Sequence, residues 1–302
     1  MDIAVVGSGA VGVATGKGLA KLGNRITFVD KSSDKVVSLK NASYDAYTPQ
    51  TYNTITTDIT MICVATPTKN GMIDLDDLKR ATKEFANRLK NHTKYHVLVI
   101  RSTVPPHTTR NILIPIVERI SGKKAGVDFG VVMQPEYLRS NTAEDDFSRP
   151  WFILIGELDS RSGNILEKVY SKLDVPIEHV SIEEAEFQKH VHNAFNAVKI
   201  AFFNEMRIIA KQEEWNVNAI FHATAESAES IWNPLYGLRD KGTFTKSSLM
   251  HDTQALIEWS KENGYNMAIL NSVVTENKTH DALISDITAP KPIIERGRLN
   301  HV

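Results

Sequence analysis

The first 180 residues alternate between short apolar runs and stretches with helical periodicity. Strands are predicted at 2–6, 25–30, 60–68, 95–106, 127–138 and 151–156. Apolar residues recur every three or four positions from Leu75 to Leu89 and predict a helix over 74–91, with Asp74 as its N-cap. Strands that are apolar throughout and alternate with helices indicate a parallel sheet covered on both faces. The pattern therefore predicts an α/β, doubly wound domain.

Beyond about residue 182 the pattern becomes helical. An apolar stripe over 183–213 predicts one helix of about 30 residues, which is long for a globular domain. Further helices are expected at 216–227, 251–264 and 267–284. We therefore expect an α/β domain over 1–182, an all-helical domain over 183–285 and a proline-containing tail over 286–302.

Composition narrows the classes of function. The chain has 35 basic and 36 acidic residues and a formal net charge of −1, so no strong field favours nucleic acid or an anionic membrane as partner. One cysteine excludes an intrachain disulfide and a cluster of thiolate metal ligands. The N-terminus lacks the features of a signal peptide, and no apolar run is long enough to span a membrane. We expect a cytoplasmic protein that acts on a small molecule.

A glycine-rich turn links the first strand to the first helix. Gly7, Gly9 and Gly12 form G-x-G-x-x-G, and Asp30 ends the second strand 18 residues after Gly12. The first glycine permits a tight turn, the second lets a pyrophosphate approach the backbone, and the third packs helix on strand. Asp30 would accept from a ribose 2′-hydroxyl and repel a 2′-phosphate, which favours NAD over NADP, although Lys31 softens that preference. This context predicts a Rossmann-type dinucleotide-binding domain; a glycine turn that only packs is the alternative.

Further segments, in chain order, carry a resemblance to one enzyme family. They are VATPT at 64–68, RSTVPP at 101–106, QPEYLRSNTAEDDFSRPWFILIG at 134–156, EAEFQKHVHNAFNAVKIAFFNE at 184–205 and HDTQAL at 251–256. From residue 1 to about 280 the chain resembles the UDP-glucose/GDP-mannose dehydrogenases. The resemblance implies that the NAD contacts extend to Ala10, Val11, Thr66, Pro67 and Thr103.

That family oxidises a sugar C6 alcohol to a carboxylate with two NAD, through an aldehyde and a thioester held on a cysteine. Carried over by motif, Thr103 and Glu136 would handle the catalytic water and the hydrolysis. Lys189 would stabilise oxyanion charge, Asn193 would orient the substrate, and Asp252 would act with the water. Each residue also has a simpler interpretation. Thr103 could close a strand end, Glu136 could be a surface-turn acid and Asp252 could cap a helix. Lys189 and Asn193, four apart, could be an exposed polar pair on a helix.

The resemblance breaks at the nucleophile. The HDTQAL segment aligns Ser248 with the cysteine and His251 with a lysine, and it puts Thr245 and Lys246 where the family has paired glycines. The family's arginine that reaches the partner subunit's substrate has no counterpart in register, Arg239 being nearby. A serine hydroxyl is a weaker nucleophile than a thiol and needs an adjacent base, which His251 could supply. These changes favour an alcohol-to-aldehyde reaction over the four-electron one.

Two further expectations concern assembly and metals. The apolar helix over 183–213 is too long for the rest of the chain to cover, and with the resemblance it predicts a homodimer through this helix. The chain ends where the family continues into a UDP-binding domain, which we expect to be absent or supplied by another chain. His190 and His192 are two apart on a helix and point different ways, so no metal site is expected.

Together these features predict a cytoplasmic, dimeric, NAD-dependent oxidoreductase that acts on a nucleotide sugar with altered or partial chemistry. Two alternatives stay open. One is a non-catalytic NAD-binding dimer derived from the family. The other is a dehydrogenase of a smaller hydroxylated or phosphorylated substrate, which would work with the helix lysine and asparagine and no cysteine.

Overall fold

The computed structural model describes residues 1–288 except 140–141, 234–235, 238–242 and 245–246. The chain divides into two compact units, Met1–Ala194 and Phe195–Val302. Each unit has a hydrophobic core of its own. Among the described residues no helix is long and apolar enough to cross a membrane.

The first unit is built on an eight-stranded sheet with the strand order β10-β9-β8-β7-β4-β1-β2-β3. Its strands are β1 (Asp2–Val6), β2 (Arg25–Val29), β3 (Asp45–Tyr47), β4 (Ile59–Ile62), β7 (His96–Ile100), β8 (Phe129–Met133), β9 (Ile153–Glu157) and β10 (Ile177–Ser181). A separate short hairpin pairs β5 (Thr68–Lys69) with β6 (Met72–Ile73). The expected doubly wound α/β architecture is confirmed; β3, β10 and the hairpin were not predicted.

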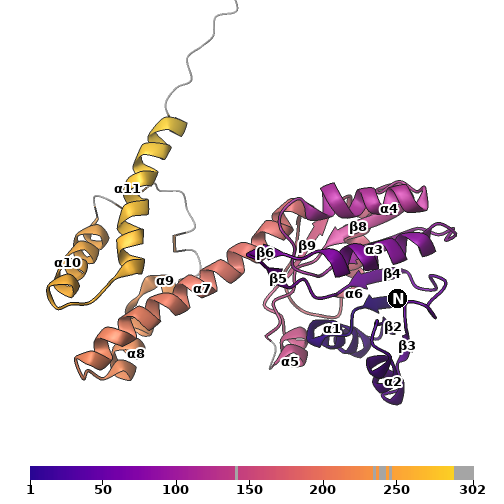
Figure 1. Ribbon diagram of the computed structural model, residues 1–302, viewed down its shortest axis with the longest axis horizontal. Coiled ribbons are helices and arrows are strands. Elements are labelled where there is room, and N and C mark those ends of the chain that lie inside the picture. Colours follow the sequence, from indigo (N-terminus) through magenta and orange to yellow (C-terminus); the bar gives the residue numbers. More distant parts are fainter. Residues whose placement is uncertain (140–141, 234–235, 238–242, 245–246, 289–302) are drawn as a thin grey trace, which may run out of the picture. The chain divides into compact units, whose positions relative to one another are not determined.

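Helices cover both faces of the sheet (Figure 1). One face packs against α1 (Ala10–Lys21), α2 (Ser33–Asn41), α5 (Ala143–Ser148) and α6 (Ser160–Val169). The other packs against α3 (Asp76–Leu89), the π-helix η1 (Thr109–Leu113), α4 (Ile114–Ser121) and the start of α7 (Ile182–Gln212). Adjacent residues of β1 therefore belong to different cores. Val5 packs in the core on the α1 side of the sheet, and Val6 packs in the core on the α3 side.

Helix α3 shows the expected apolar face but begins later than predicted. Leu78, Phe85 and Leu89 are at most 2% exposed. The helix starts at Asp76 with Leu75 at the N-cap position, so the prediction of Asp74 as cap is wrong by one residue. Asp74 instead accepts a hydrogen bond from the backbone N–H of Asp76 at 2.9 Å, which still satisfies an orphan donor of the first turn.

One strand runs against the parallel pattern. β9 pairs antiparallel to β8, through Val132 with Glu157 and Met133 with Gly156, and β10 is parallel to β9. In this register β9 begins beyond the carboxyl end of β8 and runs back toward it. The connection over 134–152 therefore begins and ends at the carboxyl edge of the sheet, where open α/β sheets bind ligands.

In the described residues of the second unit every regular element is a helix, as predicted. Its helices are the later part of α7, α8 (Val217–Ser227), α9 (Glu229–Trp232), α10 (Ser248–Glu262) and α11 (Ala268–Thr288). The long helix is confirmed, with 31 residues in α7. A small core forms where Ile209 meets Met267 and Leu270. Helix α11 runs to Thr288, three residues into the predicted tail over 286–302, and the rest of that tail lies outside the described residues.

Candidate active site

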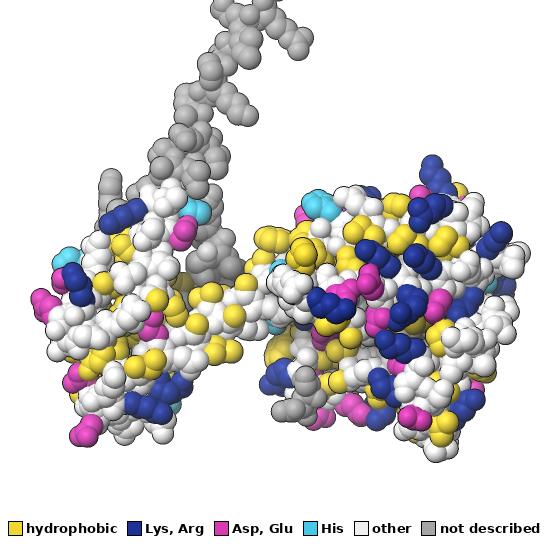
Figure 2. All heavy atoms as spheres, viewed as in Figure 1, with side chains coloured by type: hydrophobic (Ala, Val, Ile, Leu, Met, Phe, Trp, Pro, Cys, Tyr) yellow, Lys and Arg dark blue, Asp and Glu magenta, His cyan; other side chains and the backbone are white. Residues whose placement is uncertain are grey.

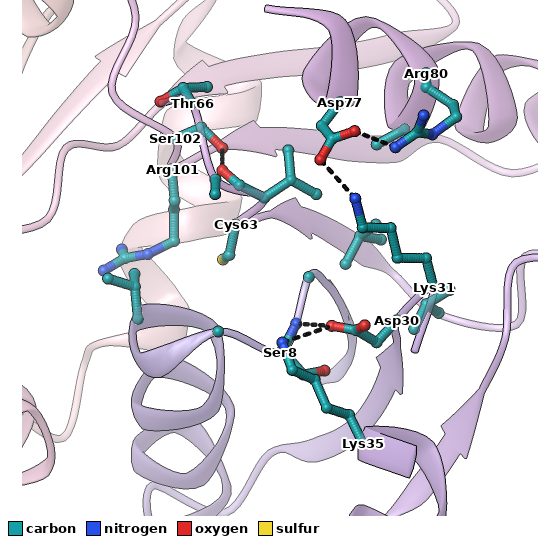
Figure 3. A pocket seen from close by; sticks show the side chains of 18 of the residues that line it. Ser8, Asp30, Lys31, Lys35, Cys63, Thr66, Asp77, Arg80, Arg101 and Ser102 are labelled. Carbon is teal, nitrogen blue, oxygen red and sulfur yellow. Dashed lines mark hydrogen bonds and ion pairs between the residues drawn. The ribbon is translucent and has the colours of Figure 1, made fainter. Parts of the chain in front are cut away.

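A cavity of about 410 Å³ opens at the carboxyl edge of the sheet (Figure 3). It lies where the chain order reverses, because β1 is flanked by β2 on one side and β4 on the other. The backbone N–H of Gly7 donates to Val29 at 2.8 Å, and that of Cys63 donates to Val6 at 2.7 Å. These bonds hold the turns after β1 and β4 against the strands, so the cavity is formed at the topological switch point of the sheet.

The three glycines of the fingerprint have separate roles in this geometry. Gly7 has φ +97°, and a side chain there would meet the backbone N of Val64 at 2.9 Å. A Cβ on Gly12 would lie 1.8 Å from the carbonyl oxygen of Gly7, so helix α1 packs against the turn too closely for any side chain. A Cβ on Gly9 would meet nothing within 4 Å. The backbone at Gly9 is therefore open to the cavity, as a bound pyrophosphate requires.

Asp30 lines the cavity and is held by the backbone. It is 7% exposed, and its Oδ2 accepts from the N–H of Ser8 at 2.5 Å while its Oδ1 accepts from the N–H of Ser32 at 2.9 Å. Lys35 lies 3.8 Å from Oδ2. Each carboxylate oxygen has a lone pair left for a ribose hydroxyl. The open glycine turn and this oriented carboxylate together fit the adenosine half of NAD.

The other predicted cofactor residues divide into two groups. Ala10, Val11, Thr66 and Thr103 line the cavity, and the hydroxyl of Thr66 donates to the carbonyl of Thr103 at 2.7 Å. Pro67 is not among the residues lining the cavity; its carbonyl accepts from the backbone N–H of Asp74 at 2.8 Å. Both threonines follow strands, so this hydrogen bond ties the ends of β4 and β7 together.

A buried arginine that sequence analysis missed forms the floor of the site. Arg101 is 5% exposed and donates to Gln134 at 2.5 Å, and Tyr170 donates to the same amide oxygen at 2.8 Å. Cys63 lies in the same wall; burial raises the pKa of its thiol to about 11, and the nearby guanidinium only partly opposes the shift. A charged residue directly after four apolar strand residues was the signal available in the sequence.

Lys189 forms an ion pair with Glu136 beside the cavity. Lys189, on α7, is 6% exposed, and its ammonium donates to the carbonyl of Glu136 and lies 3.4 Å from the Glu136 carboxylate. The other carboxylate oxygen accepts from the backbone N–H of Leu138 at 2.7 Å. Glu136 also lines the cavity. Two residues 53 apart in sequence thus form a buried ion pair beside the cofactor cavity.

Aromatic groups surround this pair. The Lys189 ammonium lies 5.3 Å from the centre of the Tyr137 ring, and His192 lies against the same ring at 4.8 Å. Burial raises the pKa of the Tyr137 phenol, and burial with the nearby Lys189 charge lowers the pKa of His192. Asn193, one helical turn beyond Lys189, is exposed. Both shifts favour the uncharged imidazole of His192 and the un-ionised phenol of Tyr137 beside Lys189.

The two histidines of α7 do not converge. His190 bonds the carbonyl of Val104 at 2.8 Å, whereas His192 lies on Tyr137. Among the described residues no group of three histidine, cysteine or acidic side chains is placed to hold a metal ion.

The remaining candidates, Ser248 and Asp252, lie in the second unit. Ser248 is the first residue of α10 and is exposed. Since the helix begins there, Asp252 lies in its second turn, and the alternative that Asp252 caps the helix is wrong. His251 pairs with Asp252 at 3.2 Å, and both side chains are exposed. Thr245, Lys246 and Arg239 lie outside the described residues.

Comparison with known proteins matches both parts of the chain to one family. The NAD-binding domain of the UDP-glucose/GDP-mannose dehydrogenase family matches residues 1–57 and 44–174. The central domain of the same family matches residues 183–279.

Individual relatives agree with this match. The GDP-mannose 6-dehydrogenase of Pseudomonas putida is 34% identical over 301 residues, which cover 92% of this chain and 68% of the relative. The UDP-glucose 6-dehydrogenase of Haloferax volcanii is 31% identical, with 92% and 69% covered. Among solved structures, a ternary complex of GDP-mannose dehydrogenase from Pseudomonas aeruginosa superposes with a TM-score of 0.89 at 31% identity, over 96% of this chain and 72% of that one.

Proposed function

The chain belongs to the UDP-glucose/GDP-mannose dehydrogenase family, and from that premise we propose that it oxidises the C6 alcohol of a nucleotide sugar with NAD. The relatives that support this substrate class are GDP-mannose and UDP-glucose 6-dehydrogenases. The observation that carries the proposal is the buried pair of Lys189 and Glu136 beside the cofactor cavity.

This pair supplies the groups that an alcohol oxidation needs. The carboxylate of Glu136 accepts the proton of the C6 hydroxyl, and the ammonium of Lys189 stabilises the alkoxide that develops on the same oxygen. NAD⁺, which the glycine turn and Asp30 would hold, would supply the acceptor for the hydride that leaves C6. The balanced step converts R–CH₂OH and NAD⁺ to R–CHO, NADH and H⁺. Asn193 and Thr103 are proposed to position the sugar and the water, and Asp252 to act with that water.

We propose that the reaction stops at the aldehyde. In the route that the resemblance implies, the second oxidation passes through an adduct on a cysteine, and Ser248 stands at that position. A serine needs a base to form such an adduct. His251, the base available in sequence, contacts Asp252 through Nδ1, and no hydrogen bond between described residues joins it to Ser248.

The assembly is proposed from the exposed face of α7. Phe187, Val191, Phe195 and Val198 are spaced four, four and three residues apart and are 48–63% exposed. Figure 2 shows hydrophobic side chains along this helix. An apolar stripe of this kind is typical of a protein interface, and a second copy of the chain is the simplest partner for it.

We assign residues 1–182 to NAD binding and 183–285 to the substrate and the dimer. A reducing cytoplasm suits a chain with one cysteine.

The test is to mix the purified protein with NAD and either GDP-mannose or UDP-glucose, and to count NADH formed per sugar consumed. One NADH per sugar and an aldehyde product support the proposal. Two NADH per sugar would contradict the aldehyde end point. No NADH, with NAD binding intact, would favour the non-catalytic alternative.

A further inference from the structure

Three basic side chains lie at the ribose end of the cofactor cavity. Lys31, Lys35 and Arg80 all line it, together with the acids Asp30, Asp77 and Glu84. Lys31 donates to Asp77 Oδ2 at 2.8 Å, and Arg80 donates to Asp77 Oδ1. Figure 3 shows the Lys31 side chain turned toward Asp77 and away from Asp30, although the two are adjacent in sequence. The carboxylate of Asp77 therefore accepts hydrogen bonds from Lys31 and Arg80 at the same time.

The position of Lys31 gives this arrangement a consequence for selectivity. NADP differs from NAD by a phosphate on the ribose 2′-oxygen, and Rossmann domains that accept it use basic side chains just after the second strand. Lys31 lies directly after Asp30, at that place, and its side chain is 69% exposed. A free lysine and arginine there could form charge-assisted hydrogen bonds to the phosphate. The hydrogen bond from Lys31 lowers the pKa of Asp77, so Asp77 is ionised at neutral pH and retains both cations.

We propose that Asp77 is a specificity-determining residue that makes the site select NAD over NADP by withholding Lys31 and Arg80 from the 2′-phosphate. Asp30 repels the phosphate directly, whereas Asp77 removes the groups that would bind it. Asp77 is the second residue of α3, and its contact with Lys31 joins segments 46 residues apart. The inference depends on cofactor binding alone, so it can fail or hold whatever the sugar substrate is.

The test compares Asp77→Asn with Asp76→Asn by titration calorimetry, using NAD⁺ and NADP⁺ as ligands at low salt. Both aspartates lie in the first turn of α3, so both variants remove one negative charge from the same helix end. Asp76 does not line the cavity, which makes it a matched control. We expect the ratio of the two dissociation constants, NADP⁺ over NAD⁺, to fall by about tenfold in Asp77→Asn and to stay unchanged in Asp76→Asn.

A second set of variants identifies the cause. Adding Lys31→Gln and Arg80→Gln to Asp77→Asn should restore the original ratio, because the released cations are then gone. If the ratio of dissociation constants stays low after Lys31 and Arg80 are replaced, the proposal is overturned. An Asp77→Asn variant whose ratio is unchanged or matches that of Asp76→Asn would also overturn it. If Asp77→Asn does not fold, Asp77→Ser releases the same cations and keeps a residue favoured at helix starts, so the same comparison applies.

Discussion

The ammonium of Lys189 on α7 donates to the main-chain carbonyl of Glu136 and lies 3.4 Å from its carboxylate. The two side chains are 8% and 13% exposed, so solvent screens the pair weakly. The carbonyl contact fixes where the ammonium sits, and the N–H of Leu138 fixes the carboxylate. A cation and a proton acceptor are thus held in place before any substrate binds.

Replacing Lys189 by methionine should lower kcat by about 10²–10³-fold, because the developing alkoxide loses its cation while much of the side-chain volume is kept. Steady-state rates with the nucleotide sugar measure the loss, and calorimetry should show that NAD⁺ still binds. Lys199→Met is the control, since Lys199 is an exposed lysine on the same helix. Unchanged turnover in Lys189→Met would remove Lys189 from the mechanism and, with it, both catalytic hypotheses.

Alanine at Gly9 and alanine at Gly12 should have different effects. The first should weaken NAD⁺ binding, and the second should destabilise the fold. Gly9→Ala meets no protein atom within 4 Å, so it should fold with a normal Tm but weaken NAD⁺ binding at least about tenfold by obstructing the pyrophosphate. Gly12→Ala places a Cβ 1.8 Å from the Gly7 carbonyl and should lower Tm sharply. Thermal melts and NAD⁺ titrations of both variants check this. A stable Gly12→Ala, or a Gly9→Ala that binds NAD⁺ normally, would contradict the assignment.

The sequence could predict those parts of the fold and site that depend on local pattern. The apolar strands, the long helix α7 and the glycine turn each have a period or spacing that can be seen within one continuous segment of sequence. The antiparallel direction of β9 could not be predicted this way, because direction depends on how the connection over 134–152 returns to the sheet. The Lys31–Asp77 contact was hidden for a related reason: it joins residues 46 apart, and no periodicity links them.

Ser248 offers a direct test of where the reaction ends. Ser248→Ala should change the rate of the first oxidation less than about twofold, because that step forms no covalent adduct and Ser248 is exposed. Ser248→Cys should raise the NADH formed per sugar above one, since a thiol ionises near neutral pH. NADH counts with product analysis distinguish these cases. Loss of turnover in Ser248→Ala would instead make the serine part of the chemistry.

Acid should destabilise the first unit through His96. This residue is fully buried in β7 and bonds the carbonyl of Thr57 at 3.0 Å and the hydroxyl of Thr60 at 2.9 Å. Burial lowers its pKa to about 3. Because the folded state keeps His96 neutral, its contribution is complete above the unfolded pKa near 6.5 and is lost as pH falls toward 3, by up to about 1.4 kcal/mol per pH unit.

The measurement is Tm between pH 7 and pH 4.5, in the wild type and in His96→Gln. The variant should be less stable at pH 7 but should lose less Tm on acidification. His222→Gln, at an exposed histidine of α8, should keep the wild-type slope. Equal slopes in His96→Gln and the wild type would show that other groups cause the acid sensitivity.

A charge placed on the apolar stripe of α7 should convert the proposed dimer to a monomer. Phe195 is 63% exposed in the single chain, and burying a lysine in its place against an apolar partner would leave an unpaired charge in the interface. Phe195→Lys should therefore halve the mass measured by light scattering after gel filtration. Ala197→Lys is the matched control, because two positions along a helix turn the side chain to roughly the opposite face and the added charge is the same. A wild-type protein that is monomeric at micromolar concentration would refute the homodimer. If Ala197→Lys dissociates the dimer and Phe195→Lys does not, the interface lies on the other face of α7.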